Sequence, residues 1–278
     1  MSSTSMICPN CRNLISTEED RCPFCGTYRP GLWGLGPALT RLFGSRIDVL
    51  TLIPTACIAL YVLSLLLDLS AALDTRSGLF GILSPGGRAL ITLGMTGGGV
   101  TFQGQWWTVF TATYLHGGLL HILFNVLWIR QLGPEVGQIY GPARYFIIFT
   151  AGGVVGFVLS NLITAHPTIG ASGAIFGLLA ALIVYGRTQK GSVSAMITRQ
   201  VWQWVILLFI FGFMMQGVNN VAHLGGFIGG WVASRLLVSG VNKGDGRLTI
   251  LFALALLIVT AAGIFLSFYN NWHLLLIG

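Results

Sequence analysis

The chain has 278 residues, of which 54% are hydrophobic and only 8% are charged, and its formal net charge is +7 at pH 7. Soluble domains carry about 25% charged residues, so this composition excludes an ordinary soluble protein and indicates an integral multi-pass membrane protein. The basic residues are spread over alternate predicted loops rather than clustered, which argues against nucleic acid as a partner.

The first 30 residues contain two Cys-x-x-Cys pairs, formed by Cys8 with Cys11 and by Cys22 with Cys25. Four thiolates at this spacing suit the tetrahedral geometry of structural zinc, and so short a segment needs a metal to fold. Closure by four cysteines leaves no open position for catalysis. Two disulfides, which a reducing cytoplasm disfavours, and an unstructured tail are the alternatives. Binding of a cytoplasmic partner and reporting of metal status are both open roles for this head.

The chain is expected to divide into a zinc-ribbon-like cytoplasmic head (1–30), a Gly/Pro/Arg linker (31–46), a six-helix membrane core (47–240) and an extra C-terminal transmembrane helix with its tail (241–278). A bilayer crossing needs roughly 17 to 25 apolar residues. Runs of this kind predict seven spans, at 47–67, 114–132, 144–164, 170–186, 201–217, 221–239 and 248–268. No apolar targeting segment precedes them, so the first span is expected to be the insertion signal.

The orientation follows from the basic residues, because Lys and Arg concentrate in cytoplasmic loops. With a cytoplasmic N-terminus, 13 of the 15 Lys and Arg residues fall on the inner side. The longest outer segment lies between the first two spans and contains GGGVTFQGQWWTVFTATYLH, which has no clean helical or strand period. Its aromatic residues suggest a place at the membrane–water interface, with an ordinary surface loop as the alternative.

Few polar side chains occur within the spans, and such groups are costly in lipid and tend to mark function. The second span has His121 and Asn125 one turn apart on one helical face, with His116 near its mouth. The fourth span begins with Ser172, and the sixth contains His223 early in its length. All three spans run from outside to inside, so these groups gather at one depth.

A serine becomes a nucleophile when a base, usually histidine, takes its proton. Either His121 or His223 could serve Ser172. The glycines that follow Ser172 and His223 favour His223, because small residues four apart let two helices approach closely. These glycines are Gly173, Gly177, Gly226 and Gly230.

That choice leaves His121 and Asn125 as donors for the negative charge that acyl transfer builds on oxygen. The backbone N–H of Ser172 adds a third donor, since the first turn of a helix leaves it unpaired. None of the eight acidic residues is near His223 in sequence, so the pattern predicts a Ser–His dyad without a carboxylate. On the residues alone, a channel or transporter and a non-catalytic binding protein stay open beside a serine hydrolase, although a site at one depth fits catalysis better than conduction.

The motifs HGGLLHILFN, GASGAIFGL and AHLGGFIGG together resemble the rhomboid family of intramembrane serine proteases, in the family's order, over roughly 46–240. The resemblance implies an all-α polytopic fold, with a six-helix core followed here by a seventh helix. It implies that Ser172 is the nucleophile, His223 the general base, and His121 and Asn125 the oxyanion hole. The remaining residues matching the family's motifs are His116, Gly170, Gly173, Gly226, Gly230 and Glu135, the last with a structural role in the loop LGPEVGQIYG.

The resemblance also implies an activity: hydrolysis of peptide bonds in transmembrane segments of other proteins, within the lipid bilayer and without a metal or cofactor in catalysis. The protein is accordingly expected in the cell (inner) membrane of a prokaryote. The family usually has an Arg after the loop tryptophan, where this chain has Thr108, which puts the stability of the loop in doubt. Some relatives have lost the dyad and only bind membrane proteins, but this chain keeps both residues and has no proline directly before GASG.

Overall fold

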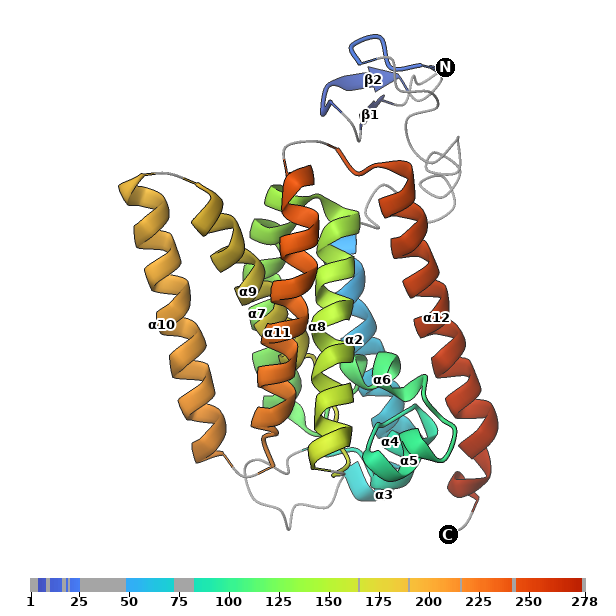
Figure 1. Ribbon diagram of the computed structural model, residues 1–278. Helices are drawn as coiled ribbons and strands as arrows, with labels where there is room; N and C mark the ends of the chain where they lie inside the picture. The colour runs from blue at the N-terminus through green and yellow to red at the C-terminus, as the bar shows by residue number, and fades with distance from the viewer. Residues whose placement is uncertain are drawn as a thin grey trace.

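The computed structural model describes residues 5–8, 11–16, 19, 21–25, 49–72, 83–164, 166–189, 191–215, 217–241 and 244–276, so the predicted linker at 31–46 lies outside them. Within these ranges, the body of the molecule is a bundle of seven helices of 17 to 25 residues (Figure 1). They are α2 (Val49–Leu67), α7 (Leu119–Tyr140), α8 (Pro142–Ile163), α9 (Ser172–Thr188), α10 (Ser192–Met214), α11 (Asn220–Leu237) and α12 (Arg247–Asn271). The predicted all-α polytopic fold is confirmed, with α2 and α7 to α11 as the core and α12 as the seventh helix.

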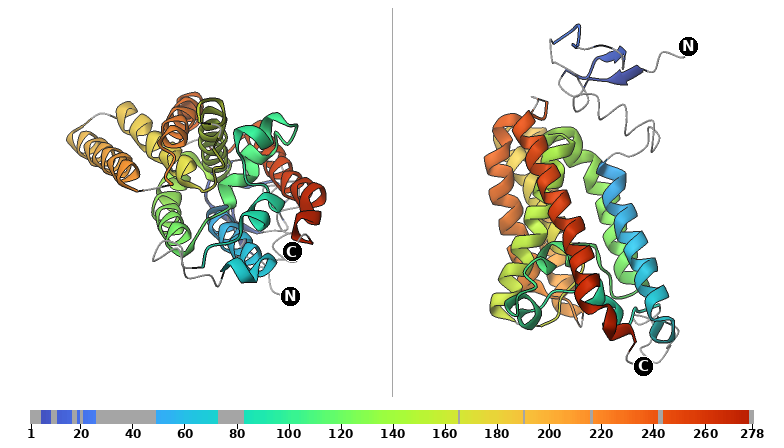
Figure 2. Two further views of the ribbon diagram at one scale, coloured as in Figure 1. Left: turned by 90° about the horizontal axis from the view of Figure 1, so that it is seen from below. Right: turned by 90° about the vertical axis from the view of Figure 1, so that its right-hand side faces the viewer.

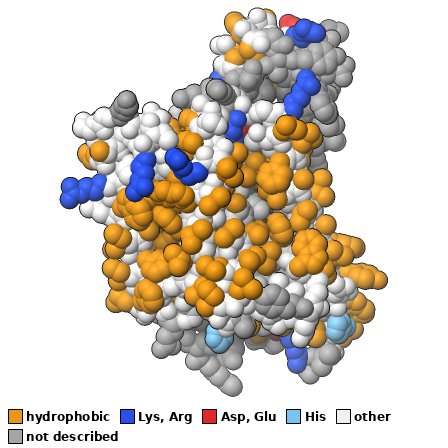
Figure 3. Space-filling model, viewed as in Figure 1, with side chains coloured by type: hydrophobic (Ala, Val, Ile, Leu, Met, Phe, Trp, Pro, Cys, Tyr) orange, Lys and Arg blue, Asp and Glu red, His pale blue; other side chains and the backbone are white. Residues whose placement is uncertain are grey.

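The outer surface of the bundle suits a bilayer. Among the described residues, five helices are long and apolar enough to cross a membrane individually, and α7 qualifies together with the short helical segment before it, from which it is bent by 94°. Figure 3 shows hydrophobic side chains across the middle of the bundle, with several Lys and Arg side chains above them. A soluble protein rarely exposes so much contiguous apolar surface, so the helices on the outside of the bundle are built to face lipid.

The central helix of the bundle is α9. Its residues from Gly173 to Val184 are all buried, as expected for a helix that is apolar on every side. Helices α7, α8, α10 and α11 all pack against it, whereas α10 and α12 lie on opposite sides of the molecule (Figures 1 and 2). A side chain at the start of α9 therefore lies inside the bundle, towards one of its ends.

Two predicted boundaries were wrong. The second span was expected at 114–132 with a loop after it, but α7 runs from Leu119 to Tyr140 and includes Pro134. Packing outweighs the proline here, because the far end of α7 buries Gly133 and Gly137 against neighbouring side chains. The fifth span was expected at 201–217, but α10 begins at Ser192. Its first turns contain polar residues, which a search for apolar runs leaves out.

The outer segment between α2 and α7 contains short helices that its sequence period did not reveal. They are α3 (Leu69–Ala72), α4 (Gly87–Thr92), α5 (Gly98–Phe102), α6 (Thr108–Thr111) and the 3-10 turn η3 (Ala112–Tyr114). Helix α6 packs against both α8 and α12, α4 packs against α12, and α5 packs against α8. The described part of the segment, from residue 83 onwards, is thus folded onto the bundle and forms a wall beside the start of α9.

At the end of the bundle away from Ser172, a buried ion pair joins α8 to the connection between α11 and α12. Arg144 in the first turn of α8 lies 3.2 Å from Asp245 Oδ1, which belongs to the connection between α11 and α12. Asp245 Oδ2 also accepts the backbone N–H of Ala143 at 2.9 Å, where a helix N-terminus favours an anion. Burial raises the pKa of Asp245, although these contacts act in the opposite direction. Two further 3-10 turns, η4 (Val238–Gly240) and η5 (Trp272–Leu275), follow α11 and α12.

The N-terminal head is a two-stranded antiparallel sheet that pairs β1 (Ser5–Ile7) with β2 (Leu14–Ser16), with Met6 opposite Ile15. It lies beyond the end of the bundle where α7 finishes (Figure 1). Arg12 Nη2 donates a hydrogen bond to the carbonyl oxygen of Gln138 in the last turn of α7, at 3.1 Å. One arginine of the head therefore satisfies a carbonyl at a helix end, where cations are favoured.

Candidate active site

The site predicted from the three motifs is assembled at the start of α9 and α11. Ser172 is the first residue of α9, and its Oγ lies 2.9 Å from His223 Nε2 on α11. The histidine is almost fully buried and Ser172 is half-buried. This separation is within the range of a nucleophile and its base.

Glycines bring the two helices together, as their spacing predicted. A Cβ atom on Gly177 would lie 3.1 Å from Gly152 Cα on α8 and 3.4 Å from Gly230 Cα on α11. One on Gly173 would lie 3.3 Å from the carbonyl oxygen of Ala222. The backbones of α8, α9 and α11 thus meet almost without intervening side chains. This close contact fixes the distance between Ser172 and His223, which follows Ala222.

His121 on α7 points a nitrogen towards the segment before Ser172. Its Nδ1 accepts the backbone N–H of Gly117 at 3.3 Å, so the neutral ring carries its hydrogen on Nε2. A Cβ on Gly170 would lie 2.6 Å from that Nε2, and Gly170 has φ of +119°, which favours glycine. The absence of a side chain at Gly170 therefore leaves a ring N–H facing the backbone two residues before the serine.

Asn125, the second predicted side-chain donor, lies one turn after His121 on α7. One N–H of its amide donates to the carbonyl oxygen of His121 at 2.8 Å, and the side chain is 5% exposed. An amide has two such hydrogens, so one stays available for a substrate oxygen. Ser172 itself opens a helix, where the backbone N–H has no carbonyl one turn earlier to bind.

The remaining motif residues take different places. His116 is completely buried, with its ring 5.1 Å from that of His121, and neither ring nitrogen has a hydrogen-bond partner among the described residues. Glu135 is exposed near the far end of α7 from the site, and it lies in the helix rather than in the expected loop.

Sequence reasoning missed two residues that contact the His223 ring. Phe176 stacks on it, with ring centroids 4.6 Å apart and an interplanar angle of 22°. Asn220 Oδ1 lies 3.1 Å from its Nδ1. Helical spacing could have indicated both contacts, because residues three or four apart lie on the same face of a helix. Phe176 follows Ser172 by four residues, and Asn220 precedes His223 by three.

Neutral side chains of the outer loop form hydrogen bonds at the position of the family's usual arginine. Thr108, at that position, is fully buried, with its Oγ1 2.8 Å from the carbonyl oxygen of Gln105 and 3.1 Å from Thr96 Oγ1. Asn161 on α8 donates to the hydroxyls of Thr96 and Thr101, both at 2.9 Å. A network of neutral groups thus occupies the place of a charged side chain.

Helix α12 holds the same loop from the other side. Trp107 Nε1 donates to Ser267 Oγ at 3.0 Å, and the amides of Gln105 and Asn271 exchange hydrogen bonds at 3.1 and 3.4 Å. A Cβ on Gly263 would lie 3.3 Å from Trp107 Cβ, so the indole packs on the helix backbone. The seventh helix is therefore a support for the loop beside the site.

Restoring the family's arginine is expected to harm this protein. Thr108→Arg places a cation among neutral hydroxyls, and a buried charge without a partner costs about 3–5 kcal/mol. The melting temperature of the purified protein in detergent should fall by several degrees, whereas Thr108→Ser, which keeps the hydroxyl, should stay close to the wild type. An arginine variant as stable as the wild type would show that the hydroxyl network contributes nothing.

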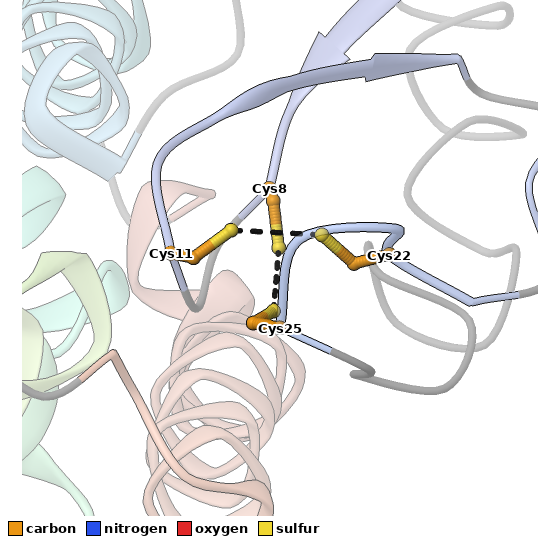
Figure 4. Close-up of side chains that lie close together, drawn as sticks. All are labelled: Cys8, Cys11, Cys22 and Cys25. Atoms are coloured by element: carbon orange, nitrogen blue, oxygen red, sulfur yellow. Dashed lines mark hydrogen bonds between the residues drawn. The ribbon is translucent and has the colours of Figure 1, made fainter.

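The four head cysteines form a cluster that can hold a metal ion (Figure 4). Their ligand atoms all lie within 4.8 Å of one another, with Cys8 and Cys25 sulfurs 3.7 Å apart and Cys11 and Cys22 sulfurs 3.5 Å apart. Four sulfurs at about 2.3 Å from a tetrahedral zinc ion lie about 3.8 Å apart, close to these values. A disulfide needs about 2.05 Å between its sulfurs, so the arrangement suits a metal and not cross-links.

Comparisons with known proteins agree with the motifs. A family model described as Rhomboid domain matches residues 103–240. The chain is 33% identical over 174 residues to Rhomboid protease GluP of Bacillus subtilis (strain 168), covering 63% of this chain and 34% of GluP. It is 30% identical over 140 residues to YdcA of the same organism, described as a candidate rhomboid protease, covering 49% of this chain and 69% of YdcA. RHOMBOID-like protein 9, chloroplastic, of Arabidopsis thaliana is 29% identical over 146 residues, and the chain spans 34% of its length.

Proposed function

The chain belongs to the rhomboid family, and on that basis we propose that it is a serine protease that cuts peptide bonds in or near transmembrane segments of other membrane proteins. The observation that carries the proposal is the 2.9 Å separation between Ser172 Oγ and His223 Nε2 inside an apolar bundle. A packing serine needs no base, and a buried histidine aimed at its hydroxyl supports a nucleophile.

The reaction begins when Ser172 Oγ attacks the scissile carbonyl carbon while its proton passes to His223 Nε2. The carbonyl oxygen becomes an oxyanion, and the Nε2–H of His121, the free amide hydrogen of Asn125 and the Ser172 N–H are the donors that face it. Removing one such donor typically costs about 10²–10³ in rate. His223 then gives its proton to the leaving amine, which departs as the carbon–nitrogen bond breaks.

The second half of the reaction releases the other product. Water attacks the acyl group on Ser172 with His223 as base, and the serine regains its proton as the ester bond breaks. Apart from water, all the groups that take part in this reaction belong to the chain itself, so the proposed mechanism uses no metal or cofactor. The imidazolium formed at each stage lies against Phe176 and Asn220 rather than against a carboxylate.

The substrates are membrane proteins whose transmembrane helix enters from the bilayer and unwinds locally to expose a carbonyl. The distribution of Lys and Arg supports a cytoplasmic N-terminus, with the site towards the outer face. The two Bacillus subtilis relatives support a place in the cell membrane of a prokaryote.

Reconstitution separates this proposal from its alternative, a catalytically inactive rhomboid-like protein that only binds membrane proteins. The purified full-length chain and a single-span test protein with small residues in its span are incorporated into liposomes. The proposal expects two fragments whose new termini, identified by mass spectrometry, lie in or near the span. Co-purification of an uncut test protein with the chain would instead favour the binding protein.

For the head we propose a structural zinc ion held by its four cysteines, whose role is to close a segment in which three of the described residues, Cys8, Ile15 and Cys22, form the buried core. No reaction step involves it. The cluster faces the end of α7 away from the dyad, as the hydrogen bond between Arg12 and Gln138 indicates. A separate place for metal and catalysis supports the division of the chain into a head, a core ending near 240 and an added helix.

Metal analysis tests the zinc ion. Purified protein is expected to contain about one zinc ion per chain, and a variant with Cys8→Ser and Cys22→Ser to contain almost none, because two ligands are too few for a closed site. Cys57→Ser is the matched control, since that cysteine is buried in α2. Cleavage should persist after chelation. Equal zinc in the double variant and the wild type would refute the assignment.

A further inference from the structure

Asn220 occupies the side of the His223 ring that faces away from the serine. It is the first residue of α11, and its Oδ1 lies 3.1 Å from His223 Nδ1, while Nε2 of the same ring lies 2.9 Å from Ser172 Oγ. Residues three apart in a helix share a face. The two ring nitrogens therefore have one partner each, a fixed amide and the proposed nucleophile.

The chemistry of these partners determines which nitrogen of the His223 ring carries the hydrogen. An amide oxygen can only accept, so Nδ1 must carry the proton in this contact, and a neutral imidazole then has a free lone pair on Nε2. That lone pair is what a general base needs to receive the hydroxyl hydrogen of Ser172. Phe176 stacked on the ring prevents it from tilting out of this alignment.

The neighbouring residue, Asn219, is also an asparagine but has different partners, so the contact with the His223 ring is specific to Asn220. Asn219 Oδ1 accepts the backbone N–H of Ala222 at 3.1 Å and so caps α11, while its Nδ2 donates to Ser160 Oγ at 2.6 Å. Asn220 instead points to the ring and is confined by α10, because even a Cβ on Gly212 would collide with its Oδ1. One asparagine thus holds the helix end, and the other holds the histidine.

We propose that Asn220 is a positioning residue that fixes the tautomer and orientation of His223, an uncharged amide in the place where many serine hydrolases have a carboxylate. This inference rests on the proposed function, because the tautomer matters only if His223 is the base. It extends the predicted dyad to three side chains on α9 and α11, although Asn220 touches neither substrate nor serine.

No carboxylate competes for the ring among the described residues. His121 on α7 is the other titratable side chain that acts on His223. The ionisable groups on the described helices packed against α11 are Arg144 and Tyr145 on α8, Tyr185 and Arg187 on α9, and Arg199 on α10. Arg144 lies beside Gly240 and Arg187 lies over the Trp231 ring, both beyond the half of α11 that contains Asn220. A charge introduced at Asn220 therefore has His223 as its main partner.

Two substitutions of Asn220 make separate predictions in the purified full-length protein. Asn220→Ala removes the acceptor, and kcat for the test substrate should fall about 10²-fold, the usual contribution of a well-aligned base, with KM within about twofold. Asn220→Asp keeps the acceptor and adds a negative charge that favours the protonated ring. The acid limb of its kcat/KM profile should move to higher pH by about one unit, and aspartate is well tolerated at a helix start.

Asn219→Ala is the matched control. It removes a helix cap, so the melting temperature should fall while the acid limb of the profile stays in place. If Asn220 has only a structural role, its variants would behave in the same way. Asn220→Ala would lose activity only to the extent that the protein unfolds, and the pH profile of kcat/KM would not move in Asn220→Asp. That pattern would overturn the inference.

Nitrogen-15 NMR of histidine-labelled protein reads the tautomer without any cleavage, with His223→Gln to assign one signal among the five histidines. Wild-type His223 is expected to carry its hydrogen on Nδ1, and Asn220→Ala to show a mixture of both tautomers. A hydrogen on Nε2 in the wild type would refute the positioning role. A hydrogen on Nδ1 in a protein that cuts no substrate would refute the protease and leave the contact with Asn220 standing.

Discussion

Ser172→Ala is expected to abolish both cleavage of a membrane substrate and covalent labelling by a fluorophosphonate probe. The probe forms its bond only with an activated serine, and the Oγ of Ser172 lies 2.9 Å from a histidine nitrogen that can take its proton. Removing a catalytic serine costs about 10⁶ in kcat in the best-studied serine protease, so a loss of at least ~10³ is expected here. His223→Ala should abolish labelling as well, since the hydroxyl then has no base. Labelling is followed by fluorescence of the purified protein in a gel.

Ser234→Ala is a control on the same helix as the base. Ser234 is fully buried, and its Oγ donates to the carbonyl oxygen of Trp231 in its own helix at 3.0 Å, so its removal should leave labelling unchanged. Probe attachment that survives in Ser172→Ala would mean that another nucleophile reacts, and the proposed role of Ser172 would be wrong. A folded wild type that never labels and never cleaves would favour the inactive binding protein.

Gly226→Ala should disable the protein through a single methyl group. A Cβ at this position would collide with the backbone of Gly173, its oxygen included, and a backbone cannot rotate away as a side chain can. Helices α9 and α11 must separate, which costs about 1–3 kcal/mol for an overpacked core and sometimes more. The same movement pulls His223 from Ser172, and a misplacement of about 1 Å can cost 10²-fold in rate. Thermal unfolding and the rate of probe labelling measure the two effects.

Gly99→Ala makes the same chemical change where there is room for it. A Cβ on Gly99, in α5, has nothing within 4 Å, and alanine is about 1 kcal/mol better than glycine inside a helix, so stability and labelling should be kept or slightly improved. If Gly226→Ala labels as fast as the wild type, the close contact of α9 with α11 is not what sets the geometry of the dyad.

Much of this arrangement could be predicted from the sequence, because the determining signals are local. The apolar runs predicted seven spans; among the described residues five helices are long and apolar enough to cross a membrane, or six with α7 and the bent segment before it, whereas α9 is shorter. Glycine spacing after Ser172 and His223 predicted the approach of two helices that is present at Gly173 and Gly177. The four cysteines are close in the chain, so their spacing alone indicated a cluster. Roles of single residues are a different matter, and those assigned to the dyad and its donors stay predictions.

Other features depend on contacts between distant segments and left no local signal. The end of α7 is set by what Gly133 and Gly137 pack against, which outweighs Pro134, and no pattern within the span contains that information. The replacement of the family's arginine by Thr108 is of this kind, because the Thr96 hydroxyl that Thr108 contacts also accepts a hydrogen bond from Asn161 of α8. Asn220 is a different case, because it lies only three residues before His223: the sequence pattern predicted no acid as a third group, and an amide can hold a ring nitrogen too.

The hydrogen bonds between the outer loop and α12 have a consequence for how the molecule is made. They join residues 160 to 179 positions apart, from Trp107 with Ser267 to Thr92 with the carbonyl of Asn271. Contacts of such long sequence separation form late, because a large loop must be closed first, and a chain emerging from the ribosome folds from its N-terminal side. The dyad can thus come together while the wall beside it is still open. A newly made chain completes that wall only once α12 has entered the membrane, so the order of synthesis delays the finished site until the bundle around it is nearly whole.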